Sequence, residues 1–365
     1  MLPLTPANNY TATILFCGGS NRQNNEWNPN RFVIVSFPAD NSCVRITPDG
    51  DKKWYDDSKL PEGRAMGNFI FLPDGTIFLA NGAGLGTSGY GTQSWTIGDS
   101  YADQPRLTPL IYFPSNQSFS RAGLTNSTIP RLYHSSAILL PDGSVFIAGS
   151  NPHPDYVVDT TYPTEYRTER FYPWYYSKRR PDPNGLLCQL GYGGSYFNVT
   201  LSNDDMNGDP NTNAPLTKAV IVRTGFSTHG LNMGQRYLEL QTSYTINLDR
   251  TVTLHVSQLP PNPNILAPGP AVIHIVVAGV PSVGKIIMVG SGVIGTQVVN
   301  AVEGLPSSGV QPSTSTSTTS GNGNGNGTGS GGHKGAATPE RRVVGVAFTV
   351  VGAATFAAVM SLFPA

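Results

Sequence analysis

The apolar residues in the first half of the chain follow one pattern that occurs twice. Residues 69–80 and 137–148 align without a gap, and in each copy an apolar run leads into Pro-Asp-Gly and then into a second apolar run. Residues 12–19 are a partial third copy, a β-rich run that ends in a glycine pair. Because Asp and Gly tolerate the dihedral angles of tight turns, each full copy predicts a β-hairpin.

Strands and turns that recur at this spacing predict a β-propeller. At about 50 residues per kelch-type blade, residues 1–180 supply about three or four blades, whereas propellers close with about four to eight. The region is therefore either a small propeller or part of a larger one. We expect the second case, with residues 1–180 forming the C-terminal blades of a kelch-type β-propeller.

The spacing of the apolar runs changes after residue 180. The later β-rich runs are short and follow one another at the intervals of a β-sandwich of roughly 100 residues; they are residues 194–201, 219–225, 236–241, 251–256 and 272–278. We expect residues 181–292 to form one immunoglobulin-like (early-set) β-sandwich. The predicted fold class of the ordered chain is all-β.

The C-terminal part changes composition twice. Residues 293–342 are expected to be a disordered linker, because residues 306–335 are almost entirely Ser, Thr, Gly, Asn and Pro. Residues 343–365 form an uncharged apolar run that could span a membrane. A glycosylphosphatidylinositol (GPI) signal fits better, with Ser330 as the attachment residue, because the nearest positive charges precede the run.

Composition supports short strands and excludes some partners. The chain has 41 Gly and 30 Pro residues and only 13% charged residues, which suits strands joined by many turns. Its formal net charge is zero and it has no Lys/Arg cluster, so we expect no nucleic-acid partner. Three cysteines are too few for a disulfide scaffold, and Cys17 and Cys43 either pair or are buried thiols.

Glycosylation signals favour an extracellular protein. Asn-x-Ser/Thr sequons occur at Asn9, Asn116, Asn126, Asn198 and Asn326. The N-terminus shows no charged region followed by an apolar core, so no signal peptide is visible. We therefore expect the chain to begin inside a longer protein.

The candidate chemistry lies at the start of the second hairpin copy. Tyr133 and His134 precede an apolar strand at the position where the first copy has Ala65 and Met66, so the scaffold itself does not require them. A packed tyrosine beside a hydrogen-bonded histidine is the alternative. With His229, they supply a phenol and two imidazoles, a plausible copper site. The other histidines, His153, His255, His274 and His333, are expected to be structural or exposed.

Four segments together resemble the fungal glyoxal oxidases, members of the galactose-oxidase-like copper radical oxidases. These segments are residues 63–67, 131–135, 227–236 and 279–282. The resemblance covers residues 10–292, with both histidine motifs in the expected order and domains. It implies one copper ion, with Tyr133 as the axial ligand, His134 beside it, and His229 delivered by the sandwich. Gln235 and Arg236 would hold the His229 loop in place.

The implied reaction oxidises small aldehydes such as glyoxal to carboxylic acids and reduces oxygen to hydrogen peroxide, with Tyr133 accepting the substrate proton. The family's second redox element, a tyrosine cross-linked to a cysteine, lies upstream of the matching segment. We therefore expect this chain to bind copper poorly and to lack the radical cofactor, as a fragment or as an inactive homologue. We expect it to be a monomer. The alternative is a non-catalytic cell-surface propeller that binds glycan, or a wall protein.

Overall fold

The computed structural model describes residues 1–20, 33–311 and the backbone of residues 359–363. This part of the chain is mostly β, in several small antiparallel sheets and a sandwich, as expected for an all-β protein. Ser330, Asn326, His333 and most of the apolar run 343–365 lie outside the described residues. None of the helices in the described ranges is long and apolar enough to cross a membrane.

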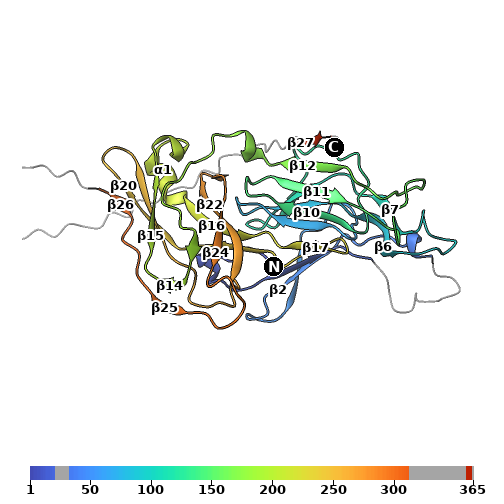
Figure 1. Ribbon diagram of the computed structural model, residues 1–365, viewed down its shortest axis with the longest axis horizontal. Coiled ribbons are helices and arrows are strands. Elements are labelled where there is room, and N and C mark those ends of the chain that lie inside the picture. The colour runs from blue at the N-terminus through green and yellow to red at the C-terminus, as the bar shows by residue number, and fades with distance from the viewer. Residues whose placement is uncertain (21–32, 312–358, 364–365) are drawn as a thin grey trace, which may run out of the picture. The chain divides into compact units, whose positions relative to one another are not determined.

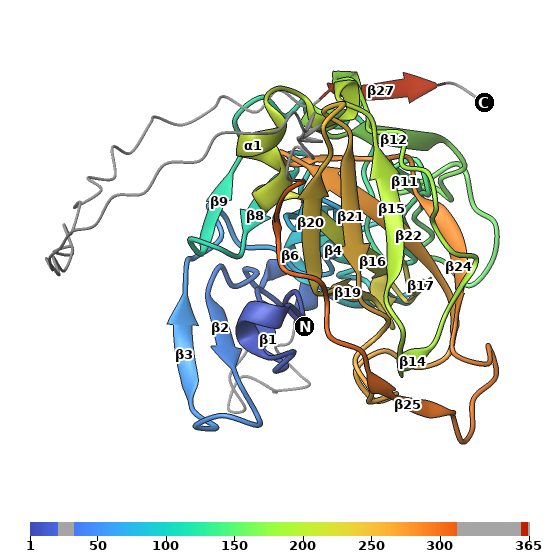
Figure 2. The same ribbon diagram turned by 90° about the vertical axis from the view of Figure 1, so that its left-hand side faces the viewer.

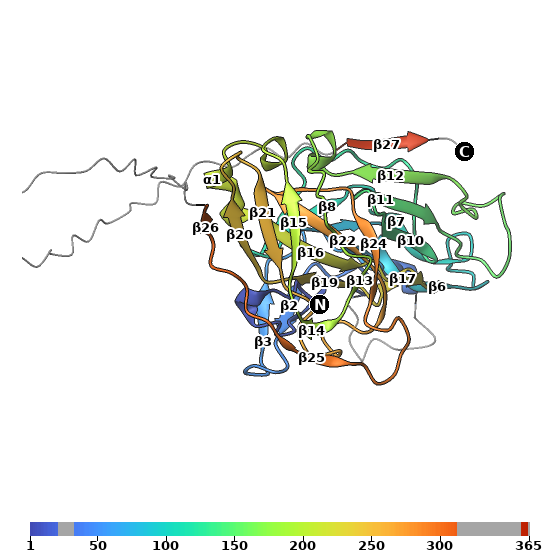
Figure 3. The same ribbon diagram turned by 60° about the vertical axis from the view of Figure 1, so that its left-hand side comes forward.

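The first 180 residues form three small sheets in succession, and residues 359–363 add a strand to the third (Figure 1). The first contains β1 (Ile14–Cys17), β2 (Cys43–Ile46) and β3 (Trp54–Asp57). The second contains β4 (Asn68–Phe71), β5 (Ile77–Ala80), β8 (Leu110–Phe113) and β9 (Ser118–Ser120). The third contains β10 (Ser135–Leu139), β11 (Val145–Gly149), β12 (Thr168–Tyr172) and β27 (Val359–Phe363), with β12 and β27 clearest in Figure 3. A separate pair, β6 (Ala83–Tyr90) and β7 (Ser100–Pro105), extends from the second sheet.

Both predicted hairpins are confirmed, as β4–β5 and β10–β11. The aspartates stabilise the two turns in the same way: Asp74 accepts hydrogen bonds from the amide and hydroxyl of Thr76 (3.0 and 2.7 Å), and Asp142 from those of Ser144 (3.0 and 2.6 Å). Gly75 and Gly143 follow with φ of 89° and 81°. Only glycine adopts this region readily, which is why Pro-Asp-Gly recurs.

The sheets pack on one another through equivalent faces. Leu79 of β5 is buried against Leu15 and Cys43 of the first sheet. Its counterpart in the third sheet, Ile147, is buried against the second sheet. The counterpart in the first sheet is Phe16, which is 63% exposed, whereas Leu79 and Ile147 are 0% exposed. The first sheet therefore presents an uncovered apolar face where the repeat elsewhere places a neighbouring sheet.

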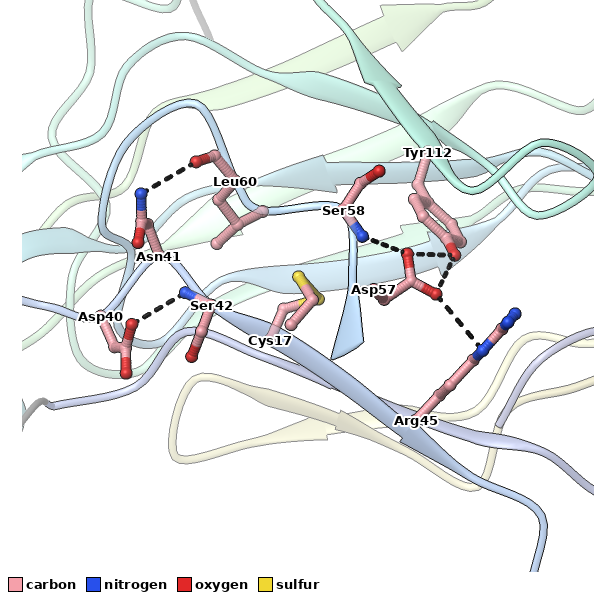
Figure 4. The surroundings of a disulfide bond; sticks show 10 residues. Cys17, Asp40, Asn41, Ser42, Arg45, Asp57, Ser58, Leu60 and Tyr112 are labelled. Carbon is pink, nitrogen blue, oxygen red and sulfur yellow. Dashed lines mark hydrogen bonds and ion pairs between the residues drawn. A yellow bond between two sulfur atoms is a disulfide. The ribbon is translucent and has the colours of Figure 1, made fainter. Parts of the chain in front are cut away.

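A disulfide joins the first two strands of the first sheet. Cys17 and Cys43 are directly opposite in the β1–β2 register and are bonded, which decides the alternative that the sequence left open (Figure 4). Near it, the Tyr112 hydroxyl donates to the Asp57 carboxylate at 3.0 Å and so ties β8 to β3. Burial and this contact raise the pKa of Tyr112.

The second region is a two-sheet sandwich, as Figure 2 shows for the sheet formed by β15, β20 and β21. One sheet has the order β13-β24-β22-β16-β19, with β23 beside β22, and the other has the order β15-β21-β20-β26. The sandwich core lies among Val199, Ile221, Leu254 and Ile275. The strands are β13 (Gln189–Leu190), β15 (Phe197–Leu201), β16 (Lys218–Arg223), β19 (Arg236–Glu239), β20 (Thr242–Ile246), β21 (Val252–Val256), β22 (Gly269–Val277), β23 (Val280–Pro281), β24 (Lys285–Val289) and β26 (Gly309–Val310).

The remaining elements are short. Two further strand pairs are β14 (Tyr192–Gly194) with β25 (Val299–Val302), and β17 (Phe226–Thr228) with β18 (Leu231–Met233). The helical turns are η1 (Pro6–Asn8), η3 (Ile34–Ser36), η4 (Trp174–Ser177), η5 (Asp204–Met206), α1 (Pro210–Asn213) and η6 (Ala214–Leu216).

Regular secondary structure continues beyond residue 293, where we expected a disordered linker to begin. β25 pairs with β14 and β26 pairs with β20, so residues 299–302 and 309–310 take part in sheets. The expectation of a disordered linker from residue 293 is wrong for these residues. The low-complexity signal begins at residue 306. Val299 and Val302 of β25 lie before it, and Val310 of β26 lies within it, so β-favouring valines supply both strands.

Candidate metal centre

Tyr133 and His134 lie in the turn that enters β10, and a buried arginine fixes this turn. Arg131 donates to the Glu169 carboxylate (2.8 Å) and to the carbonyls of Gly149 (2.7 Å) and Arg167 (2.9 Å). The Tyr133 carbonyl accepts the Asn151 amide at 2.8 Å. The turn is therefore bonded on both sides to the segments that border β11 and β12.

The third candidate ligand, His229, lies at the tip of the β17–β18 hairpin. Thr228 pairs with Leu231, which leaves a two-residue loop of His229 and Gly230. Both loop residues have positive φ, 53° and 79°, as a type I′ turn requires. This hairpin is inserted in the chain between β16 and β19 of the sandwich.

The hairpin brings His229 to the Tyr133–His134 turn. The ring centroids of Tyr133 and His134 are 3.9 Å apart. The ring centroid of His229 lies 6.0 Å from that of Tyr133 and 5.6 Å from that of His134. A side chain at Gly230 would contact His134, Leu132 and Met66 at 3.9 Å, so the hairpin tip lies between the two equivalent turns. Residues 95 positions apart in sequence thus form one cluster of a phenol and two imidazoles.

The hydrogen bonds of both imidazoles suit metal binding. The His134 Nδ1 donates to the Asn151 carbonyl at 2.9 Å, and His229 Nδ1 is hydrogen-bonded to the Thr228 hydroxyl at 2.6 Å. In each ring Nε2 has no hydrogen-bond partner among the described residues. A histidine whose Nδ1 is held in this way presents Nε2 as the ligand atom. Two imidazoles and a phenolate are donors that suit Cu(II).

The two residues expected to hold the His229 loop make different contacts. The Gln235 side chain bonds to the edge of β4, donating to the Phe69 carbonyl at 2.6 Å and accepting the Phe71 amide at 3.2 Å. Asn232 donates to the Ala137 carbonyl of β10 at 2.8 Å. Arg236 donates to the Gln235 carbonyl at 3.2 Å. The hairpin is therefore bonded through Gln235 and Asn232 to both strands that flank it.

Sequence reasoning missed Tyr90, which borders the cluster. Its ring centroid lies 6.1 Å from that of Tyr133 and 6.3 Å from that of His134, and the side chain is exposed. Tyr90 ends β6, and the β6–β7 pair has no counterpart in the third sheet. The glycine-rich run of residues 82–91 was a signal of unusual structure, but its pairing partner could not be read from it.

The cysteines of the described residues are accounted for. Cys17 and Cys43 form the disulfide, and Cys188 is a free, exposed cysteine before β13. Within the described ranges no three His, Cys, Asp or Glu side chains are grouped as a metal site. The candidate cluster contains two residues of those types and a tyrosine.

Comparison with known proteins identifies two regions. Residues 1–175 match the family described as "Glyoxal oxidase N-terminus", and residues 180–289 match "Galactose oxidase-like, Early set domain". Aldehyde oxidase GLOX of Vitis pseudoreticulata is 33% identical over 284 residues, which are 75% of this chain and 49% of that protein. Aldehyde oxidase GLOX1 of Arabidopsis thaliana is 32% identical, over 76% of this chain and 44% of that protein. The chain thus spans about half the length of these relatives.

A solved structure has the same fold over much of the chain. A fungal alcohol oxidase of the AA5 family, determined in complex with copper, aligns with a TM-score of 0.57 and 17% identity over 79% of this chain and 53% of that one. The two matched regions, the order in which they occur and these relatives lead to one conclusion. The chain carries a glyoxal oxidase N-terminal region and a galactose-oxidase-like early-set domain, and it belongs to the glyoxal oxidase and galactose oxidase family.

Proposed function

We propose that the protein is part of an extracellular copper radical oxidase that converts small aldehydes such as glyoxal to carboxylic acids. The observation that carries this proposal is the convergence of Tyr133, His134 and His229 in a chain of this family. In the proposed reaction, the hydrated aldehyde loses two electrons and two protons, and oxygen takes up both to give hydrogen peroxide.

Each of the three residues would have a distinct role. His134 and His229 would bind the metal through Nε2, because Nδ1 of each ring is already hydrogen-bonded. Tyr133 would be the phenolic ligand and would hold the proton removed from the substrate. Bound copper, together with the Tyr–Cys radical that the family carries, would supply the acceptor for the two electrons. Tyr90 would form one aromatic wall beside the substrate position.

We also propose that the three small sheets are consecutive blades of a kelch-type propeller whose other blades lie outside this chain. The regular packing of equivalent sheet faces supports this, as does the uncovered face of the first sheet around Phe16 and Trp54. His134 and His229 are exposed, which leaves room for further blades to complete the site. The Tyr–Cys pair would come from those blades.

The proposal predicts that the chain binds Cu(II) through these side chains. His134→Ala and His229→Ala should each raise the copper dissociation constant by about 100-fold or more, because each removes a ligand. Loss of a residue that only hydrogen-bonds to a ligand costs about 10–100-fold in metal affinity. Tyr133→Phe should remove the phenolate-to-copper charge-transfer absorption. Copper titration followed by electron paramagnetic resonance (EPR) and visible absorption measures both effects.

His255→Gln is the control, since His255 lies on β21 and bonds to Asn198 and Thr245 instead. Copper affinity that is unchanged in the His134 and His229 variants would refute the site. The chain alone should produce no peroxide from glyoxal and oxygen. Peroxide production by residues 1–365 would refute the view that a radical element from outside the chain is needed.

We propose an extracellular location, with the mature protein attached to the cell surface through a C-terminal GPI anchor at Ser330. The Cys17–Cys43 disulfide supports export, because disulfides persist in oxidising compartments. The four described sequon asparagines, Asn9, Asn116, Asn126 and Asn198, are all exposed. Protein isolated from its host should therefore shift to lower mass on treatment with an N-glycosidase. Release from membranes by a GPI-specific phospholipase tests the anchor, and an unshifted mass would contradict glycosylation.

A further inference from the structure

A buried chain of side chains ends at the tip of the His229 hairpin. Arg64 donates to the Asn81 carbonyl (2.6 Å), Asn81 Nδ2 donates to Asn68 Oδ1 (2.8 Å), and Asn68 Nδ2 donates to the Gly230 carbonyl (3.0 Å). Arg64, Asn68 and Asn81 are all buried. Gly230 directly follows His229, so the last bond fixes the backbone beside the candidate ligand.

The internal repeat shows which part of this chain of bonds belongs to the scaffold. In the third sheet, Arg131 donates to the Gly149 carbonyl at 2.7 Å, and Gly149 is the counterpart of Asn81. An arginine therefore donates to this carbonyl in both copies, although the gapless alignment places Arg64 opposite Leu132, one residue after Arg131. The counterparts of Asn68 and Asn81 are Ser136 and Gly149, which cannot form the amide-to-amide bond. The two asparagines are specific to the copy whose side chain donates to the Gly230 carbonyl.

The orientation of the His229 ring depends on how firmly the backbone of its hairpin is held. Its side chain is exposed, and its hydrogen bond goes to the neighbouring Thr228, which moves with the same hairpin. His229 also has a φ of 53°, a conformation that non-glycine residues adopt at some cost. In a two-residue loop, fixing the Gly230 carbonyl restricts the adjoining peptide planes and hence the direction of the His229 side chain.

We propose that Asn68, held in place by Asn81, is a positioning residue that orients His229 toward Tyr133 and His134. The inference rests on the proposed copper site and extends it to two residues outside the ligand set. A buried amide that both donates and accepts suits this task, because losing it leaves the Gly230 carbonyl without its partner inside the protein.

The test uses the full chain and Cu(II) alone. Asn68→Ala should raise the copper dissociation constant about 10- to 100-fold and change the EPR spectrum. In a His229→Ala background, the same substitution should have no further effect, because residues that act through one another are not additive. An equal effect in both backgrounds would overturn the proposal, since it would indicate general destabilisation.

Two further measurements keep the outcome clear. Asn81→Ala should raise the copper dissociation constant by a few fold, because Asn68 then loses the hydrogen bond that holds it in place. Asn213→Ala is the matched control. The Asn213 side chain also donates to a backbone carbonyl, that of Met206 at 2.7 Å, but Asn213 lies in α1 and not beside the hairpin. It should leave copper affinity unchanged.

Hydrogen exchange of the metal-free protein separates this proposal from the copper site itself. Asn68→Ala should speed amide exchange in residues 226–233, while Asn213→Ala should not. Unchanged exchange in the hairpin would refute the positioning role whatever the metal does. A third outcome is possible: the wild type shows no histidine-dependent copper binding, but the hairpin of Asn68→Ala still exchanges faster than that of the wild type. This outcome would support the positioning of His229 and contradict the proposed function.

Discussion

Replacing Arg131 with methionine should lower the free energy of unfolding by about 3–5 kcal/mol, the range for breaking a buried ion pair from one side. Arg131 and Glu169 are each only 2% exposed, and their closest atoms lie 2.8 Å apart. Methionine would fill much of the space but would leave the Glu169 carboxylate unpaired. The carbonyls of Gly149 and Arg167 would also lose their donor.

Chemical denaturation followed by circular dichroism measures this loss. The control is Arg167→Met, because the Arg167 side chain is largely exposed and pairs with Glu165. It should change the free energy of unfolding by less than about 1 kcal/mol. Adding Glu169→Gln to Arg131→Met should restore part of the stability by removing the unpaired charge. Similar losses from Arg131→Met and Arg167→Met would contradict the argument.

Acidification should destabilise the protein through His274. Burial in β22, together with the positive charge of Arg180, lowers the pKa of His274 to about 4. Below the ordinary histidine pKa of about 6.5, the unfolded chain binds a proton that the folded protein does not. The contribution of His274 to stability is therefore full above pH 6.5 and falls as the pH decreases towards 4. At about 1.36 kcal/mol per pH unit, the total loss is about 3 kcal/mol.

The matched variant is His274→Asn, whose amide can keep the donation that His274 Nδ1 makes to the Ser282 carbonyl at 3.0 Å. The free energy of unfolding should be measured between pH 7.5 and 4 in both proteins. Carboxylates that titrate in this range are common to the two, so the difference isolates His274. The wild type should lose about 3 kcal/mol more than the variant. Parallel pH profiles would show that His274 does not titrate as its burial requires.

The two hairpins and five strands of the sandwich could be predicted because their signals are local; the five are β15, β16, β19, β21 and β22. Pro-Asp-Gly specifies a turn through its own dihedral preferences, and each of these five strands lies in a continuous β-rich run. The strands β20 and β24 of the sandwich were not predicted. The candidate ligands were also found from sequence, since comparing Tyr133 and His134 with Ala65 and Met66 separates the scaffold from the added chemistry. The structure places both near His229, at ring-centroid distances of 6.0 Å from Tyr133 and 5.6 Å from His134.

The features that sequence reasoning missed depend on contacts between distant residues. Tyr90 reaches the site because β6 pairs with β7, and glycine-rich sequence predicts no partner. Asn68 is the first residue of a strand and resembles any polar strand end until its side chain is seen to contact Gly230. The Cys17–Cys43 pair was equally undetermined, because only the β1–β2 register places the two residues opposite each other. The role of Arg236 stays a prediction.

The left-handed backbone conformation of His134 also occurs at its counterpart in the other copy of the repeat. Met66, the counterpart of His134, has a φ of 59° and His134 has a φ of 64°, although methionine is no ligand here. The scaffold therefore adopts this conformation both with and without a candidate ligand at this position. The second sheet offers the same backbone geometry beside the same hairpin tip. Met66 is thus a natural position at which protein engineering could install another imidazole by changing one side chain alone.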